Sequence, residues 1–352
     1  MRLGRVVAAW VLVVGGGGRL QAETVKSLEA EMPVSAGGFF GVENLAGALK
    51  VVPAPGPAVR VRATVHGESE ELAGSLSFAT VTDKDGIPTL RLQYPVDRVR
   101  EFQYPARGSG RDTGVEYAGR RVQISATRGV LLYADLVVEV PAGAGRGRLA
   151  TRAGAIDAER LDGNLRLDTG SGPIRLSHSR GNLVADSGSG DVDATDIQGS
   201  FRCDTGSGTC HVEDFEGDTL DCDTGSGSVV VLRARARSLR ADTGSGRVRL
   251  EAVDAEEVSA DTGSGSVEMA VTGGRLRKVS ADTGSGTVRL RLPRDAEFAA
   301  KASLGSGNLR CEYADARTTV KNDEVVGCRR GDGRIAIAVD TGNGGLVIEP
   351  TP

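Results

Sequence analysis

Aromatic residues are scarce in this chain. They make up 4% of the 352 residues, and the single tryptophan, Trp10, lies close to the N-terminus. Aromatic side chains supply much of the buried area of a thick globular core, so their scarcity argues against such a core. It favours a narrow interior that Val, Leu and Ala can fill.

Apolar runs long enough to cross a membrane are missing. The run Val6 to Val14 has nine residues, whereas a membrane-spanning helix needs about 20. This run follows Arg2 and Arg5 and precedes Ala22, which is the arrangement of a secretory signal peptide. Residues 1–22 are therefore predicted to be a signal peptide, with a buried N-terminal strand as the alternative. Export would place the protein in the periplasm, on the cell surface or outside the cell.

The chain also lacks a basic excess and is poor in histidine. Its formal charge is −4, and loss of the three arginines in residues 1–22 makes it −7. This acidity argues against nucleic acid as a partner. The three histidines, His66, His178 and His211, are isolated in the sequence. No catalytic triad is apparent, and we expect no cofactor.

The main feature that is present is a short repeat. Copies and variants of D-T-G-S-G begin at Asp168, Asp186, Asp204, Asp223, Asp242, Asp261, Asp282, Ser303 and Asp340. Consecutive starts up to Ser303 are 18 to 21 residues apart. A constant period in this range is typical of stacked repeat architectures, in which each copy packs against its neighbours.

The residues around each copy alternate between apolar and polar. Positions one and three before the Asp, and six and eight after it, are apolar in nearly every copy. This alternation predicts strands with one buried face. We therefore predict an all-β fold, a single-stranded parallel β-solenoid with coils of about 19 residues. The glycines of T-G-S-G are expected at a corner, because they accept a positive φ and leave no Cβ to collide with the next coil.

The segment before the regular repeats is less periodic. Residues 23–145 contain strand-like runs separated by turn signals such as Asp85-Gly86. We interpret them as an irregular β region that caps the solenoid, which then covers residues 146–350. A separate β-sandwich is the alternative.

The order of these segments resembles a known family. Val42 to Gly47 is followed by Leu49 to Val52, then by Leu136 to Pro141, the T-G-S-G copies and the closing run Ile335 to Ile348. This order is similar to the bacterial β-strand-repeat family labelled "putative adhesin", which occurs in secreted and envelope proteins and has no established function. The resemblance implies a repetitive β fold and supplies no catalytic residues.

Two enzyme classes share features with the chain. D-T-G-S also surrounds the catalytic Asp of aspartic proteases, but that chemistry needs two carboxylates that share one proton, whereas stacked copies form a ladder. Polysaccharide lyases and hydrolases often use β-solenoids, and need clustered carboxylates in a groove. The acids that lie near one another in sequence are Asp162, Asp191, Asp193 and Asp196. A carbohydrate-active enzyme is therefore the alternative function.

Five cysteines are present, and export permits disulfides. Cys203 and Cys222 hold the same position in adjacent repeats, so a bond between them is one of two open alternatives. Cys311 and Cys328 bracket an irregular segment and are expected to be bonded. Cys210 is then a buried thiol. Zinc bound by Cys203, Cys210 and the adjacent His211 is disfavoured, because both cysteines occupy core positions.

Arginines gather within two neighbouring repeats. They are Arg233, Arg235, Arg237, Arg240, Arg247 and Arg249. Alternation places most of them on outward faces. They form either a solvated face or a surface for an anionic polymer, since arginine suits bidentate recognition of carboxylate and phosphate.

The repeated Asp should form a ladder of carboxylates, which repel one another. We expect corner N–H groups to bond each carboxylate and to lower its pKa, with calcium as the alternative. Taken together, the sequence predicts a secreted or envelope-associated, non-enzymatic protein with a binding, adhesive or scaffolding role. Its partner is unknown, the candidates being an envelope polysaccharide, lipid phosphate or another envelope protein.

Overall fold

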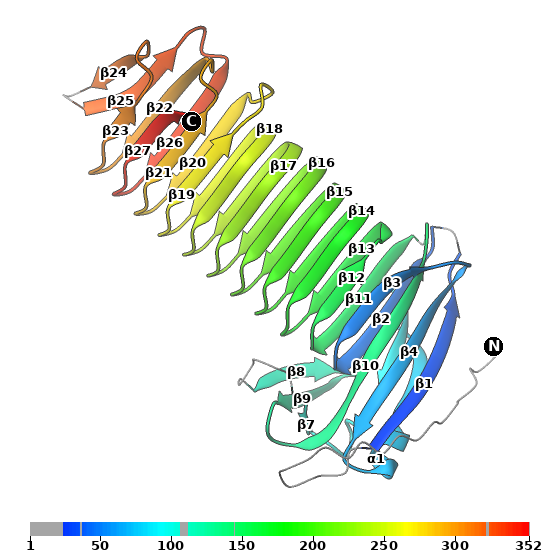
Figure 1. Ribbon diagram of the computed structural model, residues 1–352. Coiled ribbons are helices and arrows are strands. Elements are labelled where there is room, and N and C mark those ends of the chain that lie inside the picture. The colour runs from blue at the N-terminus through cyan, green and yellow to red at the C-terminus, as the bar shows by residue number, and fades with distance from the viewer. Residues whose placement is uncertain (1–23, 36, 106–111, 144, 322–323, 352) are drawn as a thin grey trace, which may run out of the picture. The chain divides into compact units, whose positions relative to one another are not determined.

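Strands account for most of the residues that the structure describes (Figure 1). A computed structural model describes residues 24–35, 37–105, 112–143, 145–321 and 324–351, so the predicted signal peptide lies outside the described residues. These residues form 27 strands and a single helix of six residues. The all-β prediction is confirmed. Within the described ranges, no helix is long and apolar enough to cross a membrane.

The chain forms two compact units, which are described separately. Unit 1 comprises residues 1–179 and 185–188, unit 2 comprises residues 180–184 and 189–352, and β14 (Ile174–Ser187) contributes to both. The other elements of unit 1 are β1 (Thr24–Pro33), β2 (Phe39–Ala46), β3 (Leu49–Ala54), β4 (Ala58–Gly67), α1 (Glu70–Ser75), β5 (Ser77–Thr82), β6 (Pro88–Gln93), β7 (Glu101–Gln103), β8 (Thr113–Tyr117), β9 (Arg120–Ser125), β10 (Val130–Pro141), β11 (Arg146–Ala153), β12 (Ile156–Glu159) and β13 (Asp162–Thr169). The other elements of unit 2 are β15 (Val192–Thr205), β16 (Cys210–Thr224), β17 (Val229–Thr243), β18 (Val248–Thr262), β19 (Val267–Val271), β20 (Lys278–Thr283), β21 (Val288–Leu292), β22 (Phe298–Leu304), β23 (Leu309–Cys311), β24 (Arg317–Lys321), β25 (Glu324–Arg330), β26 (Ile335–Thr341) and β27 (Leu346–Pro350).

Unit 1 combines antiparallel and parallel strand pairs. β4 lies antiparallel between β1 and β10. β2 pairs in parallel with β11 on one side and with β6 on the other, while β3 pairs in parallel with β10 and β12. The hairpins β5–β6 and β8–β9 are antiparallel. Residues 23–145 thus contribute strands directly beside β11 and β12, and the predicted domain boundary at residue 145 stays a prediction.

Unit 2 is a ladder of parallel strands in register. β15, β16, β17 and β18 pair successively, and Asp204, Asp223, Asp242 and Asp261 occupy matching positions. The predicted apolar columns are buried, as at Leu220, which is 0% exposed. Each fully buried Val or Leu side chain contributes roughly 1.5–3 kcal/mol. Short aliphatic side chains therefore supply the interior, as the scarcity of aromatic residues predicts.

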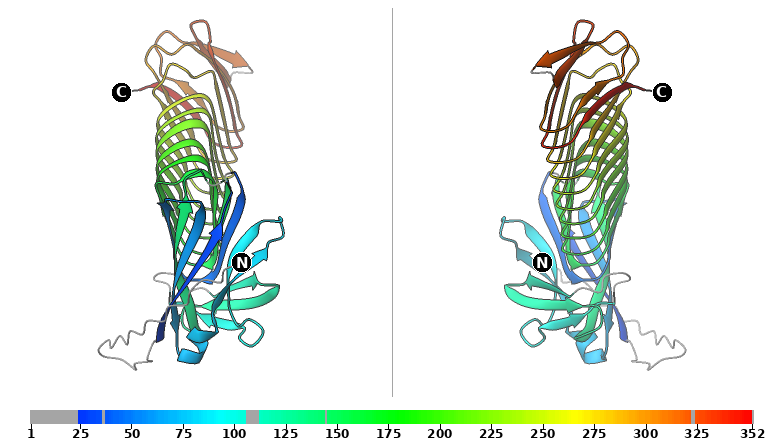
Figure 2. Two further views of the ribbon diagram at one scale, coloured as in Figure 1. Left: turned by 90° about the vertical axis from the view of Figure 1, so that its right-hand side faces the viewer. Right: turned by 90° about the vertical axis from the view of Figure 1, so that its left-hand side faces the viewer.

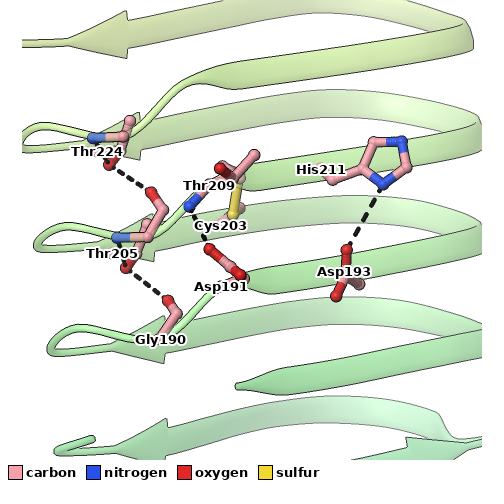
Figure 3. The surroundings of a disulfide bond; sticks show 11 residues. Gly190, Asp191, Asp193, Cys203, Thr205, Thr209, His211 and Thr224 are labelled. Carbon is pink, nitrogen blue, oxygen red and sulfur yellow. Dashed lines mark hydrogen bonds and ion pairs between the residues drawn. A yellow bond between two sulfur atoms is a disulfide. The ribbon is translucent and has the colours of Figure 1, made fainter. Parts of the chain in front are cut away.

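The corners of the coils are held by threonine. The Thr224 hydroxyl donates to the carbonyl oxygen of Gly208 at 2.9 Å and accepts from the Gly227 N–H at 3.1 Å. The same pair of bonds recurs at Thr243, which donates to Gly227 at 2.7 Å, and Figure 3 shows the donated bond at Thr205 and Thr224. Because threonine points inward at the corner, its hydroxyl receives the corner N–H that we had expected to reach the Asp carboxylate.

Of the two predicted reasons for glycine at the corner, close approach to the next coil is the one that holds at Gly244. Gly244 is not among the residues with positive φ. A Cβ at Gly244 would instead collide with the carbonyl oxygen of Gly225 in the preceding coil. Close backbone approach between coils therefore excludes a side chain at this position.

The C-terminal strands do not stack in chain order. β26 pairs with β20 on one side and β22 on the other, and β27 lies likewise between β21 and β23 (Figure 1). Asp340 is therefore next to Asp282, and Ser303 follows it. β25 pairs antiparallel with β22 and with β24. The last strands of the chain thus occupy an internal position in unit 2.

Candidate functional site

Two disulfides are formed in unit 2, and one differs from the expected pairing. Cys311 is bonded to Cys328, with 6.6 Å between their Cα atoms. Cys203 is bonded to Cys210, at a Cα separation of 6.3 Å, and Cys222 is a buried free thiol. The Cys203–Cys222 bond, which the sequence left as one of two alternatives, is therefore not formed. These two residues are register partners that point side by side into the core, whereas Cys210 faces Cys203 from the opposite strand.

The first disulfide occupies the site where zinc was considered. Both Cys203 and Cys210 are in the bond. His211 instead lies with Nδ1 3.5 Å from a carboxylate oxygen of Asp193 (Figure 3). Asp191 accepts the Thr209 N–H at 2.7 Å. These acids therefore serve local contacts between adjacent strands.

The six predicted surface arginines contact side chains of the protein itself. Their partners are Asp214 and Glu213 for Arg233, Asp254 for Arg235, Asp218 for Arg237, Asp242 for Arg240, Ser266 for Arg247 and Glu251 for Arg249. Five of the six are thus in ion pairs. The hydrogen bond that Arg237 donates to Asp218 raises the pKa of Arg237 and lowers the pKa of Asp218.

The six arginines also do not share one face. Arg240 lies between the inward-pointing Leu239 and Ala241 before the corner, and Arg249 lies between the inward-pointing Val248 and Leu250 after it. The strands before and after a corner face each other across the core, as the Cys203–Cys210 bond requires. Arg240 and Arg249 therefore project from opposite faces.

The predicted Asp ladder is present, but its electrostatics differ from the prediction. Burial, followed by the charges of Asp242 and Asp282, raises the pKa of Asp261. Burial and the charges of Asp242 and Asp204 likewise raise the pKa of Asp223. The predicted lowering is wrong for these two carboxylates, because the corner N–H groups bond threonine and the neighbouring Asp charges are not offset by such bonds.

A polar cavity lies elsewhere, in unit 1. It has a volume of about 520 Å³. Its wall is the outward side of β6, β2 and β11, and the turn of the β5–β6 hairpin and the β8–β9 hairpin complete its lining. Figure 2 shows both hairpins projecting from unit 1 on the same side.

Outward positions on the floor of the cavity carry small side chains or none. Gly41 on β2, Ala150 on β11 and Gly170 after β13 all line it. A Cβ at Gly41 would collide with the Thr89 side chain, and one at Gly170 would lie 2.5 Å from the Arg152 carbonyl oxygen. Neighbouring groups therefore leave no room for a side chain at Gly41 and Gly170.

The wall carries a buried carboxylate between two guanidinium groups. Glu43 is 8% exposed. Its two oxygens accept from Arg91 Nε at 2.6 Å and from an Arg152 terminal nitrogen at 2.8 Å. Arg91 also lies over the ring of Tyr117 at 5.8 Å. Burial, and then the Glu43 charge, raises the pKa of Tyr117.

A third arginine of the wall is held by a different acid. Arg148 donates to Asp168 at 2.8 Å and lies 3.8 Å from Asp85. Burial acts to lower the pKa of Arg148, but the hydrogen bond to Asp168 and the charges of Asp168, Asp83 and Glu43 together outweigh it, and the net pKa is raised. The Nε atoms of Arg148 and Arg152 are buried and have no hydrogen-bond acceptor within the described part of the chain.

Sequence reasoning missed these residues. Arg91 lies 48 positions, and Arg152 lies 109 positions, from Glu43, so only strand pairing brings them together. The one local signal is Glu43 itself, an acid within the apolar run Phe39 to Ala46. A charged residue in a buried strand requires a partner. Arg148 and Arg152, which lie on the same side of a later strand, were candidates for the partner of Glu43.

Comparisons with known proteins identify the family and solved structures that resemble the chain. One is a putative lipid binding protein from Parabacteroides distasonis ATCC 8503, with 13% identity, a TM-score of 0.45, and coverage of 93% of this chain and 97% of that one. Another is a putative adhesin from Parabacteroides merdae ATCC 43184, with 11% identity, a TM-score of 0.38 and the same coverage. No curated protein matches the chain.

The family match covers residues 136–348, and the family is described as Toastrack DUF4097. The matched segment includes Leu136 to Pro141 and all T-G-S-G copies. It therefore confirms the resemblance to the bacterial "putative adhesin" repeat family, which has no established function. The chain belongs to the Toastrack DUF4097 family.

Proposed function

We propose that this protein is an exported, non-enzymatic binding protein of the cell envelope with an adhesive or scaffolding role. On this proposal it is a parallel β-solenoid with coils of about 19 residues. Register partners such as Cys210 and Val229, or Val229 and Val248, support this coil length. The candidate partners are an envelope polysaccharide, lipid phosphate or another envelope protein.

The observation that carries a binding role is the cavity with its charged wall. A hollow of about 520 Å³ is within the usual size of small-molecule sites, in which a few fixed polar groups orient the ligand. Glu43, Arg91 and Arg152 are such groups, because two ion pairs that share the Glu43 carboxylate fix all three side chains. A rigid polar wall favours specific recognition of a ligand.

The same geometry favours binding over catalysis. A catalytic carboxylate must reach the proton or carbon on which it acts. Both oxygens of Glu43 are already bonded to guanidinium groups, which supports a positioning role for this carboxylate. A carbohydrate-active enzyme stays the alternative, and an anion-binding role for Arg233, Arg235 and their neighbours stays a prediction.

A sedimentation experiment tests the proposal. Purified residues 23–352 are incubated with insoluble peptidoglycan, with lipopolysaccharide vesicles and with whole envelope that retains its proteins, and bound protein is measured after centrifugation. We expect saturable binding to at least one preparation and no release of reducing ends or unsaturated sugars. Product release would establish the enzyme alternative, and absence of binding to every preparation would reject the binding role.

A further inference from the structure

We propose that the cavity of unit 1 binds uncharged, hydroxyl-bearing ligands, namely the end of a neutral oligosaccharide. This inference rests on the proposed binding function and names the class of ligand for it. Its basis is the way in which the charges of the wall are paired. Three properties of the site carry it: charge balance, the mixture of donors and acceptors, and the construction of the mouth.

The cations of the wall are already compensated within the protein. Arg91 and Arg152 share Glu43, and Arg148 is bonded to Asp168. An incoming carboxylate or phosphate would have to displace Glu43, which is 8% exposed, and would leave that carboxylate buried without its partners. Removing one member of a buried ion pair is strongly unfavourable. The pairing therefore disfavours an anion despite the three arginines.

The acids around the cavity add to this effect. Asp83 and Glu116 line it, together with Lys84. The lining thus presents carboxylates as well as cations, and an anionic ligand would meet repulsion that a neutral one avoids. Anionic ligands depend on a local excess of opposite charge. Four cations, Lys84, Arg91, Arg148 and Arg152, line the cavity with three carboxylates, and Asp168, which is bonded to Arg148, is the fourth carboxylate, so no such excess remains.

A neutral hydroxyl group matches the wall better. A hydroxyl both donates and accepts, a carboxylate only accepts, and a guanidinium only donates. Glu43 and Arg91 lie side by side at 2.6 Å, so two adjacent hydroxyl groups of a sugar can donate to one and accept from the other. Hydrogen bonds to charged groups are the stronger kind, and they need no net charge on the ligand.

Two donors of the wall lack an acceptor in the described structure. The Nε atoms of Arg148 and Arg152 are buried and have no hydrogen-bond partner there. Unsatisfied buried donors are unfavourable. A ligand oxygen placed beside a slightly rotated guanidinium would supply the acceptor, and the ion pair through the terminal nitrogens would be kept.

The mouth of the cavity allows entry from solvent. Lys84, Glu116 and Ala118 lie on the two hairpins and are exposed, whereas Ala150 on the floor is 3% exposed. The half-buried Val115 on β8 also lines the cavity. A larger side chain at Val115 would therefore occupy the cavity. The substitution would be confined to the β8–β9 hairpin at the edge of unit 1.

A binding experiment with matched variants tests the proposal. Residues 23–352 are applied to an array of neutral glucose, galactose, mannose and N-acetylglucosamine oligosaccharides, and dissociation constants are measured for the sugars that bind. Inorganic phosphate and galacturonate serve as anionic comparators. The variants are Val115→Trp, which fills the cavity, and Arg148→Gln, which removes the guanidinium. The control is Arg240→Gln, which breaks a comparable ion pair outside the cavity.

We expect a neutral sugar to bind. Val115→Trp should raise its dissociation constant by roughly tenfold or more because the indole fills the space for the ligand, and Arg148→Gln should do the same because it removes a charge-assisted bond. Arg240→Gln should change it less than about twofold. Raising the salt from about 50 to about 500 mM should also change it less than about twofold. If Arg148→Gln fails to fold, Val115→Trp still decides the matter.

Three outcomes would overturn the inference. They are the absence of any neutral sugar that binds, binding that both cavity variants leave unchanged, and salt-sensitive binding of phosphate or galacturonate in the cavity. Envelope sedimentation separates these failures from failure of the proposed function. A Val115→Trp protein that still sediments with envelopes retains the binding role and rejects only the sugar site, whereas a wild-type protein that does not sediment rejects the role itself.

Discussion

At the scale of single residues, the Asp and the Thr of the repeated motif have different roles. The alternation of apolar and polar residues predicted which positions are buried, because a strand turns successive side chains to opposite sides. It could not tell which of Asp and Thr bonds the corner, because both recur in nearly every copy. The inward direction of Thr243, 1% exposed, decides this, and the adjacent Asp242 is left on the outer face.

Thr243→Val should lower the free energy of unfolding by roughly 1–3 kcal/mol, because it leaves the half-buried Gly246 N–H without its acceptor and removes the bond to Gly227. Thr243→Ser keeps the hydroxyl and should lower the free energy of unfolding much less. Urea unfolding followed by circular dichroism measures both. A valine variant as stable as the serine variant would contradict the role of the hydroxyl.

Asp261→Asn should stabilise the protein at pH 7. The pKa of Asp261 is raised in the folded state by burial and by Asp242 and Asp282. A raised pKa means that its contribution to stability is present below the unfolded pKa, about 4, and is lost as the pH rises through the folded pKa. The gain from Asn, about 0.5 kcal/mol or less after solvent screening, should therefore appear at pH 7 and vanish near pH 3.

Asp218→Asn is the matched control for this pH dependence. Arg237 lowers the pKa of Asp218, so the stability linked to Asp218 is present above its unfolded pKa and is lost as the pH falls through the folded pKa. Asp218→Asn should therefore destabilise at pH 7. Denaturation at both pH values checks the pair, and equal signs for the two variants would rule out the ladder explanation.

At the scale of elements, strand register brings together side chains that are far apart in the sequence. The strands of unit 2 could be predicted because copies of one motif pair with each other. The cavity could not, because β2, β6 and β11 have different sequences and are far apart in the chain. Only the pairing of Glu43 with Arg91 on β6 and Ala150 on β11 places the three arginines around one hollow.

Glu43→Leu should destabilise unit 1 by about 3 kcal/mol, because it leaves Arg91 and Arg152 largely buried without their shared carboxylate. The triple variant Glu43→Leu, Arg91→Leu, Arg152→Leu should recover most of this loss, since no charge is then left unpaired. Thermal and urea unfolding compare them. A single variant as stable as the wild type would mean that the ion pairs contribute little.

The disulfides also depend on how strands face one another. Cys203 and Cys210 belong to strands that face each other, whereas Cys222 is a neighbour along the ladder. After alkylation of the native protein, mass spectrometry should find Cys203–Cys210 and Cys311–Cys328 linked and Cys222 unlabelled, because burial raises the pKa of the Cys222 thiol and shields it. Labelling of Cys222 should follow unfolding. A Cys203–Cys222 peptide would refute this arrangement.

At the scale of the whole molecule, repetition should make single coils dispensable. Deleting residues 223–241 removes one repeat and joins Cys222 to Asp242, and the remaining strands keep matching columns. Since each repeat contacts only its neighbours, we expect a folded protein with a modestly lower melting temperature. Gly244→Val should be more harmful, because its side chain meets the Gly225 carbonyl. Circular dichroism distinguishes the two, and an unfolded deletion beside a native-like Gly244→Val would contradict the stacking.

The same repetition limits how far chain order predicts spatial order. The copies beginning at Asp282, Ser303 and Asp340 present similar edges, so the sequence spacing alone suggests that they stack in turn. The structure instead places β26 between β20 and β22. Strands with the same motif present equivalent edges, so the motif alone does not decide which of them pair. The irregular segment that includes β24 and β25 is long enough for the chain to pass β22 and place β26 beside β20.

This arrangement has a consequence for the order in which the protein can be completed. During synthesis the N-terminal side emerges first, and strands up to β21 can be added as they appear. β22 then lacks its parallel neighbour β26, which lies near the end of the chain, and can pair only with β25. Until that end arrives, β20 and β21 expose unpaired backbone groups, which other chains can pair with. A protein that lacks its last residues would lose β26 and β27, which are internal strands of unit 2. The edges of β20 and β21 would then stay unpaired and could pair with other chains.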